Sequence, residues 1–471
     1  MPKLDPSSRE FRETGHQLID RIADYLDGVD NYRVLSNVKP GEVASKFPAV
    51  PSAEGRPYDA LIADFESKIV PGITHWNHPA FFAYFSITGS QAGILAELLM
   101  AALNLNGMLW KTSPAHTELE TVTLEWLRKS LGLPDGLFGI INDTASINSF
   151  LALAAAREAL GFDIRGKGMT GRDLPPLKVY CSEHAHSSIE KGALALGFGA
   201  SGVEQIASDD KFRMRPDALD AAVKRDRAAG ALPCAVTATL GTTSTASVDP
   251  LPQIADIAKR EKMWLHVDAA YAGSATVEPS LRWLWKGIQS ADSIVVNPHK
   301  WFFTPIDCSV LYTRKPDMLR QTFSLVPEYL KTTDSAEVNY MDYGIQLGRR
   351  FRALKLWMVM EHYGTDRIRS VIRDHVRYAE RLASELTKRS DVELLAPQSF
   401  SVVVFRKVVR SGSGIDEAAS EMITAELLER MNASGRLFVS HTKLRNKYGI
   451  RVAIGNGATE WEHVARVLEF L

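Results

Sequence analysis

The sequence predicts an α/β fold built around a large, mostly parallel β-sheet. Short apolar runs occur at residues 178–181, 235–240, 264–267 and 293–296, and helical patterns such as residues 250–262 separate them. Polar residues follow several of these runs directly. This alternation is the βαβ pattern of a parallel sheet with helices on both faces. Buried parallel strands read as short apolar runs, and their carboxyl ends open onto the ligand crevice.

The first 80 residues predict a helical arm rather than a domain. Residues 7–28 place Phe11, Leu18 and Ile22 on one stripe of an amphipathic helix, and a second helix is expected near residues 58–69. The segment between them is rich in Pro and Gly. These helices hold too few apolar residues for a core of their own. We therefore expect the arm to pack on the main domain or on a partner subunit.

Two further domains are expected after the arm. Residues 81–365 carry the alternating pattern, with one helix opening at Ser113-Pro114, where proline is favoured, and another after Asp143-Thr144. Residues 366–471 predict a smaller α+β domain. Its elements are a charged helix over residues 366–389, strands at 401–405 and 450–453, and a helix near 415–431.

Composition excludes several classes of partner. Lys and Arg total 55 against 56 for Asp and Glu, so no charge excess indicates nucleic acid or an anionic membrane. Cys181, Cys234 and Cys308 are far apart and form no CxxC pair, which argues against a disulfide scaffold or a metal site. The chain shows no signal-peptide pattern and no run of 18 apolar residues. We expect a cytoplasmic protein without a membrane span.

Asp268 and Lys300 are the most informative candidate site residues. Each follows a predicted buried strand, Asp268 in Val267-Asp268-Ala269 and Lys300 in Asn297-Pro298-His299-Lys300-Trp301. Singly, such residues are usually a helix cap and a surface lysine. Together they are the two groups that pyridoxal 5′-phosphate (PLP) needs. The lysine forms a Schiff base with the aldehyde, and the aspartate pairs with the protonated pyridine nitrogen.

Further residues extend this hypothesis to the rest of the cofactor. Thr144, Ala145 and Ser146 open a predicted helix, whose free N–H groups and dipole favour the phosphate, although an ordinary N-cap is the alternative. His186 follows the strand at 178–181 and is expected to stack on the pyridine ring or to transfer protons, unless it is a surface loop histidine. Thr242 lies in a small turn beside the ring, where plain turn chemistry is the alternative.

With these residues assembled, the chain resembles the group II PLP-dependent decarboxylases, most closely the aromatic-L-amino-acid decarboxylases. The resemblance covers nearly the whole chain. Its most specific segments are His266-Val267-Asp268-Ala269-Ala270-Tyr271-Ala272-Gly273, Asn297-Pro298-His299-Lys300-Trp301 and Leu347-Gly348-Arg349-Arg350-Phe351-Arg352.

The resemblance implies a fold-type-I PLP enzyme that works as a homodimer, with the arm around the partner and the site at the interface. It implies that Ala270 packs on the ring face opposite His186 and that Asn297 and His299 lie near the phosphate. Tyr84 and Phe85 are implied to line the substrate side.

Tyr329 matches a catalytic tyrosine on a loop of the family, which is implied to deliver a proton to the substrate Cα. Related aldehyde synthases commonly carry phenylalanine there and react with oxygen. Where many animal relatives have Ile-Gly-Phe, this chain has Asn106-Gly107-Met108. Asn106 offers a polar group to a ring substituent, and Met108 adapts to a bulky ring.

The expected activity is decarboxylation of a small-molecule aromatic L-amino acid to an arylalkylamine and CO₂. Phenylalanine, tyrosine, tryptophan and dihydroxyphenylalanine all stay open as substrates. Three alternatives stay open as well. They are an aldehyde synthase on the same scaffold, a PLP aminotransferase in which Arg349 clamps the α-carboxylate, and a non-catalytic scaffold protein that has kept the fold.

Overall fold

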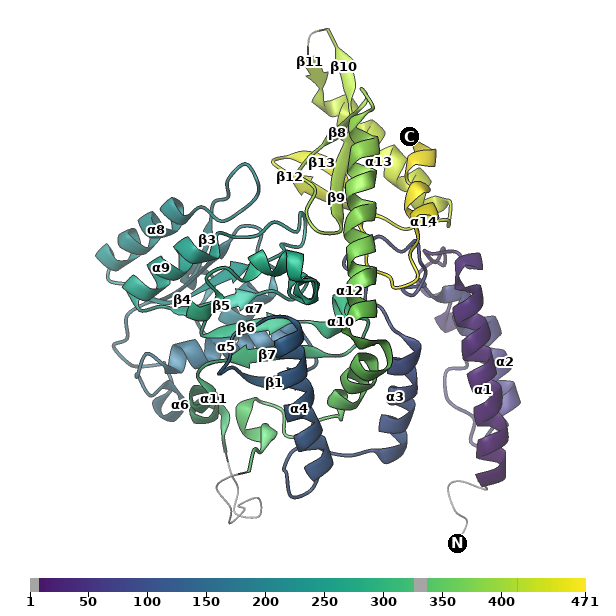
Figure 1. Cartoon of the computed structure of the whole chain (residues 1–471), viewed down its shortest axis with the longest axis horizontal. Coiled ribbons are helices and arrows are strands. Elements are labelled where there is room, and N and C mark those ends of the chain that lie inside the picture. The colour runs from purple at the N-terminus through teal and green to yellow at the C-terminus, as the bar shows by residue number, and fades with distance from the viewer. Residues whose placement is uncertain (1–7, 326–336, 413) are drawn as a thin grey trace.

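The computed structural model describes residues 8–325, 337–412 and 414–471, and a seven-stranded sheet lies at its centre (Figure 1). The strand order is β1-β7-β6-β5-β4-β2-β3. β7 runs antiparallel to both of its neighbours, and the remaining pairs are parallel. The predicted mostly parallel sheet is therefore confirmed. The strands are β1 (Phe138–Asn142), β2 (Leu177–Ser182), β3 (Val203–Ile206), β4 (Leu232–Thr239), β5 (Trp264–Asp268), β6 (Ser293–Val296) and β7 (Ser309–Thr313).

Helices bury both faces of this sheet. One core cluster contains Leu151 of α5 and Ile189 of α7, and the other contains Leu124 of α4 and Ile254 of α9. Because both faces are covered, every residue of β5 and β6 is buried. The large-domain helices are α3 (Gln91–Leu103), α4 (Pro114–Ser130), α5 (Ala145–Glu158), α6 (Ile164–Lys167), α7 (Ser188–Ala195), α8 (Pro216–Ala228), α9 (Leu251–Glu261), α10 (Pro298–Trp301) and α11 (Pro316–Phe323).

The C-terminal part forms a four-stranded antiparallel sheet in the order β12-β13-β9-β8. The helix predicted over residues 366–389 is confirmed as the second segment of a longer helix that begins at Arg352. Gly364 breaks this helix with φ 64° and ψ 164°. The elements are α12 (Arg352–Thr387), β8 (Val392–Leu394), β9 (Val402–Lys407), β10 (Val409–Ser411), β11 (Gly414–Asp416), α13 (Glu417–Ala433), β12 (Ser440–Leu444), β13 (Lys447–Ala453) and α14 (Trp461–Ala465).

The predicted N-terminal arm is present as two helices at the edge of the molecule (Figure 1). They are α1 (Ser8–Gly28) and α2 (Tyr58–Asp64), and Arg21 of α1 forms an ion pair with Glu66 in the turn after α2. α1 buries none of its residues, and Phe11 is 71% exposed. Its apolar stripe therefore has little covering among the residues that the structure describes. Among the described residues, no helix is both long and apolar enough to cross a membrane.

Candidate active site

Asp268 and Lys300 lie at the same edge of the sheet because β5 and β6 are adjacent and parallel. Asp268 ends β5, and Lys300 lies in the one-turn helix α10 that follows β6. Burial lowers the pKa of Lys300; the charge of Asp268 opposes this shift, and the charge of Arg451 adds to it. A lysine whose pKa is lowered is a better nucleophile at neutral pH. The structure thus brings together the two residues on which the PLP hypothesis depends.

The carboxylate of Asp268 has a fixed orientation. Its Oδ1 accepts a hydrogen bond from the Ala270 backbone N–H at 3.1 Å, and the side chain is 5% exposed. This contact also places Ala270 beside the carboxylate. A buried, oriented anion suits a protonated ring nitrogen, because a paired charge is tolerated where a lone one is costly.

His186 is electrostatically coupled to both residues. Burial lowers its pKa, while Asp268 raises it and Lys300 lowers it, so all three side chains share one site. Nδ1 accepts the Ser188 backbone N–H at 3.2 Å and lies 2.8 Å from the Ser188 hydroxyl. These contacts leave Nε2 free. His184 instead packs against Phe212 and lies 3.2 Å from the Ser208 hydroxyl, which separates its role from that of His186.

The start of α5 fits an anion, although one of its residues is also a conventional cap. Thr144 is the N-cap, and its hydroxyl accepts the Ile147 N–H at 3.5 Å. Ala145 and Ser146 occupy the first helical positions, and Ser146 is exposed. Both the capping role and the open N–H groups are therefore present. The assignment of the phosphate to this helix end stays a prediction.

A buried amide network fixes the neighbouring segment. Asn142 donates to Asn148 at 2.7 Å, Asn148 donates to Ser309 at 2.7 Å, and Ser309 donates to Asn297 at 2.5 Å. The network joins β1, α5, β7 and the residue before α10. It gives Asn148 a structural role.

His299 is buried and neutral. Its Nδ1 accepts the Cys308 backbone N–H at 2.9 Å, while burial and the charge of Lys300 lower its pKa to about 3. The hydrogen of the neutral ring therefore lies on Nε2, which can donate to a bound group.

The hydroxyl of Thr242 already has partners within the chain. It is buried, lies 3.0 Å from the Thr245 hydroxyl and accepts the Ser247 N–H. A cofactor contact of Thr242 stays a prediction.

The two aromatic residues predicted for the substrate side have different surroundings. The ring of Phe85 is buried, and the Lys300 amine lies 5.2 Å from its centre. The ring of Tyr84 is 54% exposed and stacks on Trp76 at 5.8 Å. Phe85 is thus placed beside the reactive amine, whereas the substrate role of Tyr84 stays a prediction.

Arg451 of β13 is a site residue that sequence reasoning missed. Its guanidinium lies 4.6 Å from the centre of the Phe85 ring and donates to the Tyr84 carbonyl and to the Ser244 carbonyl. Its Nη2 is buried and has no partner among the residues that the structure describes. A buried donor without a partner costs about 1–3 kcal/mol, so it fits an anionic group of a bound molecule. The signal was an arginine inside the apolar run 450–453.

Asn106 and Met108 lie on a different surface. Asn106 is exposed, and its Oδ1 accepts the Arg349 backbone N–H at 3.0 Å. The Arg349 side chain pairs with buried Glu120 at 2.6 Å. Although burial opposes the shift, Arg349 and His116 lower the pKa of Glu120 to about 2. Arg349 is therefore engaged in an internal ion pair.

Tyr329, the predicted catalytic tyrosine, lies outside the described residues.

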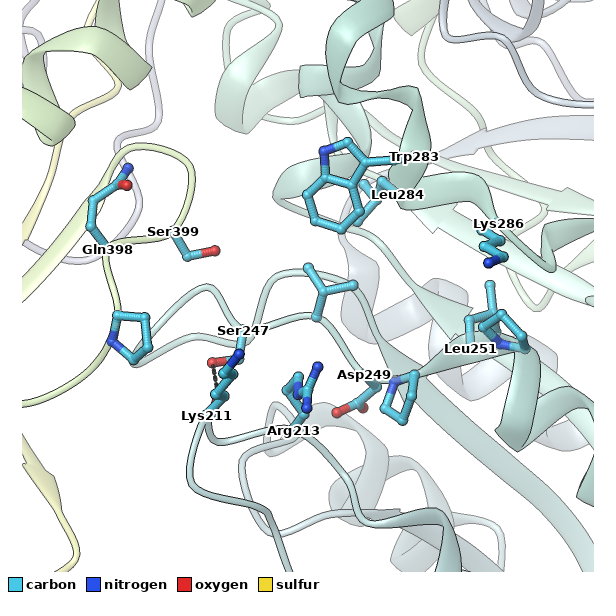
Figure 2. Close-up of a pocket in the computed structure, with 14 residues that line it drawn as sticks. Lys211, Arg213, Ser247, Asp249, Leu251, Trp283, Leu284, Lys286, Gln398 and Ser399 are labelled. Carbon is cyan, nitrogen blue, oxygen red and sulfur yellow. Dashed lines mark hydrogen bonds between the residues drawn. The ribbon is translucent and has the colours of Figure 1, made fainter.

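A separate cavity of about 320 Å³ lies between the large domain and the 397–399 loop (Figure 2). Trp283 points into it, above Lys211 and Arg213. Ser247 donates to the Lys211 carbonyl at 2.8 Å on its wall. None of the predicted site residues lines this cavity, so we assign the chemistry to the strand ends and not to this space.

The chain is similar to known proteins over almost its full length. Residues 40–408 match the model of the pyridoxal-dependent decarboxylase conserved domain. Tyrosine decarboxylase 4 of Petroselinum crispum is 40% identical, covering 100% of this chain and 94% of the relative. Phenylacetaldehyde synthase of Arabidopsis thaliana is 39% identical, covering 97% and 94%.

The solved structure of Oryza sativa TDC with PLP and tryptamine superposes with a TM-score of 0.94 at 36% identity. It covers 100% of this chain and 98% of that one. The Asp268–Lys300 arrangement at the strand ends is therefore found in a chain whose sequence and fold both match PLP-binding decarboxylases. The protein belongs to the pyridoxal-dependent decarboxylase family.

Proposed function

We propose that this enzyme decarboxylates aromatic L-amino acids to arylalkylamines and CO₂. The observation that carries this proposal is the placement of Phe85 beside the Lys300 amine, which itself shares a site with Asp268. An aromatic ring at this position favours an aromatic substrate side chain. The relatives named for tyrosine decarboxylation and the structure that contains tryptamine support the same substrate class.

PLP, when bound, supplies an electron sink for the carbanion that loss of carbon dioxide leaves at the substrate Cα. Lys300 would hold the cofactor covalently, and Asp268 would keep a proton on its ring nitrogen. His186 would cover one ring face and Ala270 the other. The N–H groups at Ala145 and Ser146 would hold the phosphate beside Thr144, whose own N–H donates to the Asp143 carboxylate. Asn297 and His299 would lie nearby, and Thr242 would lie beside the ring.

The roles on the substrate side follow from charge and shape. Arg451 has a buried donor left over, which would bind an anionic group of the incoming molecule. Phe85 would contact the aromatic ring, with Tyr84 at the outer side of the same segment. Tyr329 would deliver the proton to Cα after carbon dioxide leaves. A tyrosine there favours amine formation over the oxygen-dependent reaction.

We further propose that the enzyme is a cytoplasmic homodimer whose site is completed by its partner. Large apolar side chains are exposed along α1 and α3, including Phe11, Leu98 (53%) and Leu103 (55%). An apolar surface of this extent is typical of an interface. Asn106 and Met108 follow α3 directly, so a partner that covers α3 would bring them toward its own site. The arm would gain its covering in the same way.

One product assay tests the chemistry. Purified holoenzyme is given phenylalanine, tyrosine, tryptophan or dihydroxyphenylalanine, and amine, aldehyde, peroxide and ammonia are measured. We expect one amine per CO₂ and little peroxide. Stoichiometric peroxide with aldehyde would support the alternative suggested by the phenylacetaldehyde synthase relative. Turnover that requires a keto acid would support an aminotransferase.

A further inference from the structure

Three buried aromatic rings form a stack that ends beside Lys300. Phe85 lies on Tyr271 with ring centres 3.7 Å apart, and Tyr271 lies on Trp301 at 4.8 Å with planes 2° apart. The rings are 8%, 4% and 0% exposed, respectively. Trp301 directly follows Lys300 in the chain. The orientation of its indole is therefore tied to the backbone that carries the reactive amine.

His375 of α12 holds the far end of this stack. Trp301 Nε1 donates to His375 Nδ1 at 2.9 Å, and the two ring planes differ by 8°. The imidazole is fully buried, and His375 Nε2 lies 2.9 Å from the Asn456 carbonyl oxygen. An indole nitrogen can only donate. Nδ1 must therefore accept, and Nε2 must carry the hydrogen, so the two neighbours fix one neutral tautomer.

This bond joins two parts of the molecule that are separated by a break. His375 lies after Gly364, in the segment of α12 that packs on the small sheet through Ala379 and Leu382. Trp301 lies in α10, which is only four residues long. An isolated helix of one turn is not stable without tertiary contacts. α10 thus depends on contacts such as this bond for its position.

We propose that His375 is a positioning residue for Lys300, acting through the Trp301 indole and linking the small-domain segment of α12 to the reactive amine. This inference rests on the proposed role of Lys300. The imidazole touches neither Lys300 nor the predicted cofactor residues among the contacts described here, so its effect is on geometry. Through this link, the position of the Lys300 amine depends on the orientation of the small domain.

Four variants test the link in the full-length holoenzyme. Trp301→Phe removes the donor and keeps a ring, and His375→Leu removes both hydrogen bonds. His375→Gln keeps an acceptor and a donor on one side chain. The matched control is Trp285→Phe, because Trp285 is also buried and donates to the Leu131 carbonyl at 2.8 Å, outside the stack.

We expect Trp301→Phe and His375→Leu each to lower kcat about tenfold, with KM changed less than about twofold, since misplacement of a reacting group acts on the chemical step. His375→Gln should recover most of the loss. The double variant should be no slower than the slower single variant, because both changes cut the same link. Trp285→Phe should lower the melting temperature and leave kcat unchanged.

A readout without cofactor separates this inference from the proposed function. In the cofactor-free protein, His375→Leu should reduce the near-ultraviolet circular dichroism of the aromatic stack, and His375→Gln should restore it. The inference is overturned if the kcat losses of the two single variants multiply, if Trp285→Phe slows turnover equally, or if His375→Leu leaves kcat unchanged. Failure to find a borohydride-reduced cofactor on Lys300 in the wild type would instead overturn the proposed function, whatever the dichroism shows.

Discussion

The surroundings of Lys300 and those of Asn106 differ in how complete they are within one chain. Around Lys300, contacts of the same chain fix nearly every group, as the Asp268–Ala270 hydrogen bond and the Phe85–Tyr271–Trp301 stack show. Around Asn106, one face of α3 and the segment after it are exposed, including Leu98, Leu103 and Leu105. In the proposed homodimer, one subunit would build the cofactor half of the site, and the partner would cover the exposed surface around Asn106.

The largest effect should come from the cofactor half. Asp268→Ala is expected to lower kcat about 10²–10³-fold, the size of effect seen when one oriented electrostatic group is lost from a catalytic site. Steady-state amine formation measures it. Asp268→Asn keeps an acceptor for the Ala270 N–H and removes only the charge. If the Asn variant retained most of the activity, the charge of Asp268 would not be the group that matters.

A smaller effect is expected from the exposed half. Leu98→Glu on α3 places a charge in the proposed interface and should weaken the dimer about 100-fold, since burying a leucine contributes about 1.5–3 kcal/mol. Sedimentation at several protein concentrations measures the change. Met422→Glu is the control, because Met422 is 61% exposed on α13, away from the arm. A wild type that sediments as a monomer would refute the two-subunit site.

Only some strands of the large sheet could be predicted from the sequence. The strand at residues 293–296 was predicted correctly because a buried parallel strand has a continuous apolar signal. β3 was missed, since its residues Val-Glu-Gln-Ile are partly exposed and carry no such signal. β1 and β7 were not predicted either.

Long-range contacts could not be predicted from local patterns. Arg451 reaches Phe85 across 366 positions of sequence, and no short-range rule brings β13 to the end of β6. The first segment of α12, before the break at Gly364, was missed because it follows a polar segment that gave no clear boundary. The roles of Thr242 and Tyr84 stay predictions. The Thr242 hydroxyl contacts that of Thr245, and the Tyr84 ring stacks on Trp76, so neither contact involves Lys300 or Asp268.

Substrate preference should respond modestly to Asn106. Asn106→Ile removes the polar side chain and should lower the kcat/KM ratio for dihydroxyphenylalanine over phenylalanine about fivefold, which is within the range that one pocket group provides. Competition between the two substrates in one reaction measures the ratio directly. If the ratio stays constant while both rates fall equally, the change acts through the Arg349 backbone contact and not on the substrate.

The smallest effect concerns stability in acid. Burial lowers the pKa of His375 to about 4 from an ordinary value of 6.5. The unfolded chain therefore takes up this proton first as the pH falls. The stabilisation is present in full above pH 6.5 and is lost between about pH 6.5 and 4, by up to about 1.4 kcal/mol per pH unit.

Urea unfolding of the cofactor-free protein at pH 7 and pH 5, at one protein concentration, measures this slope. His375→Gln should make it shallower by up to one proton. An equal slope in wild type and His375→Gln would mean that the imidazole is not buried as a neutral group.

The most direct test of the site is chemical reduction of the holoenzyme with borohydride, followed by digestion and peptide mapping. The arrangement of β5 and β6 predicts a single reduced cofactor adduct, on the peptide that contains Asn297-Pro298-His299-Lys300-Trp301, with Lys300→Ala giving none. An adduct on any other lysine, or a wild type with no adduct, would contradict the assignment of this strand edge as the active site.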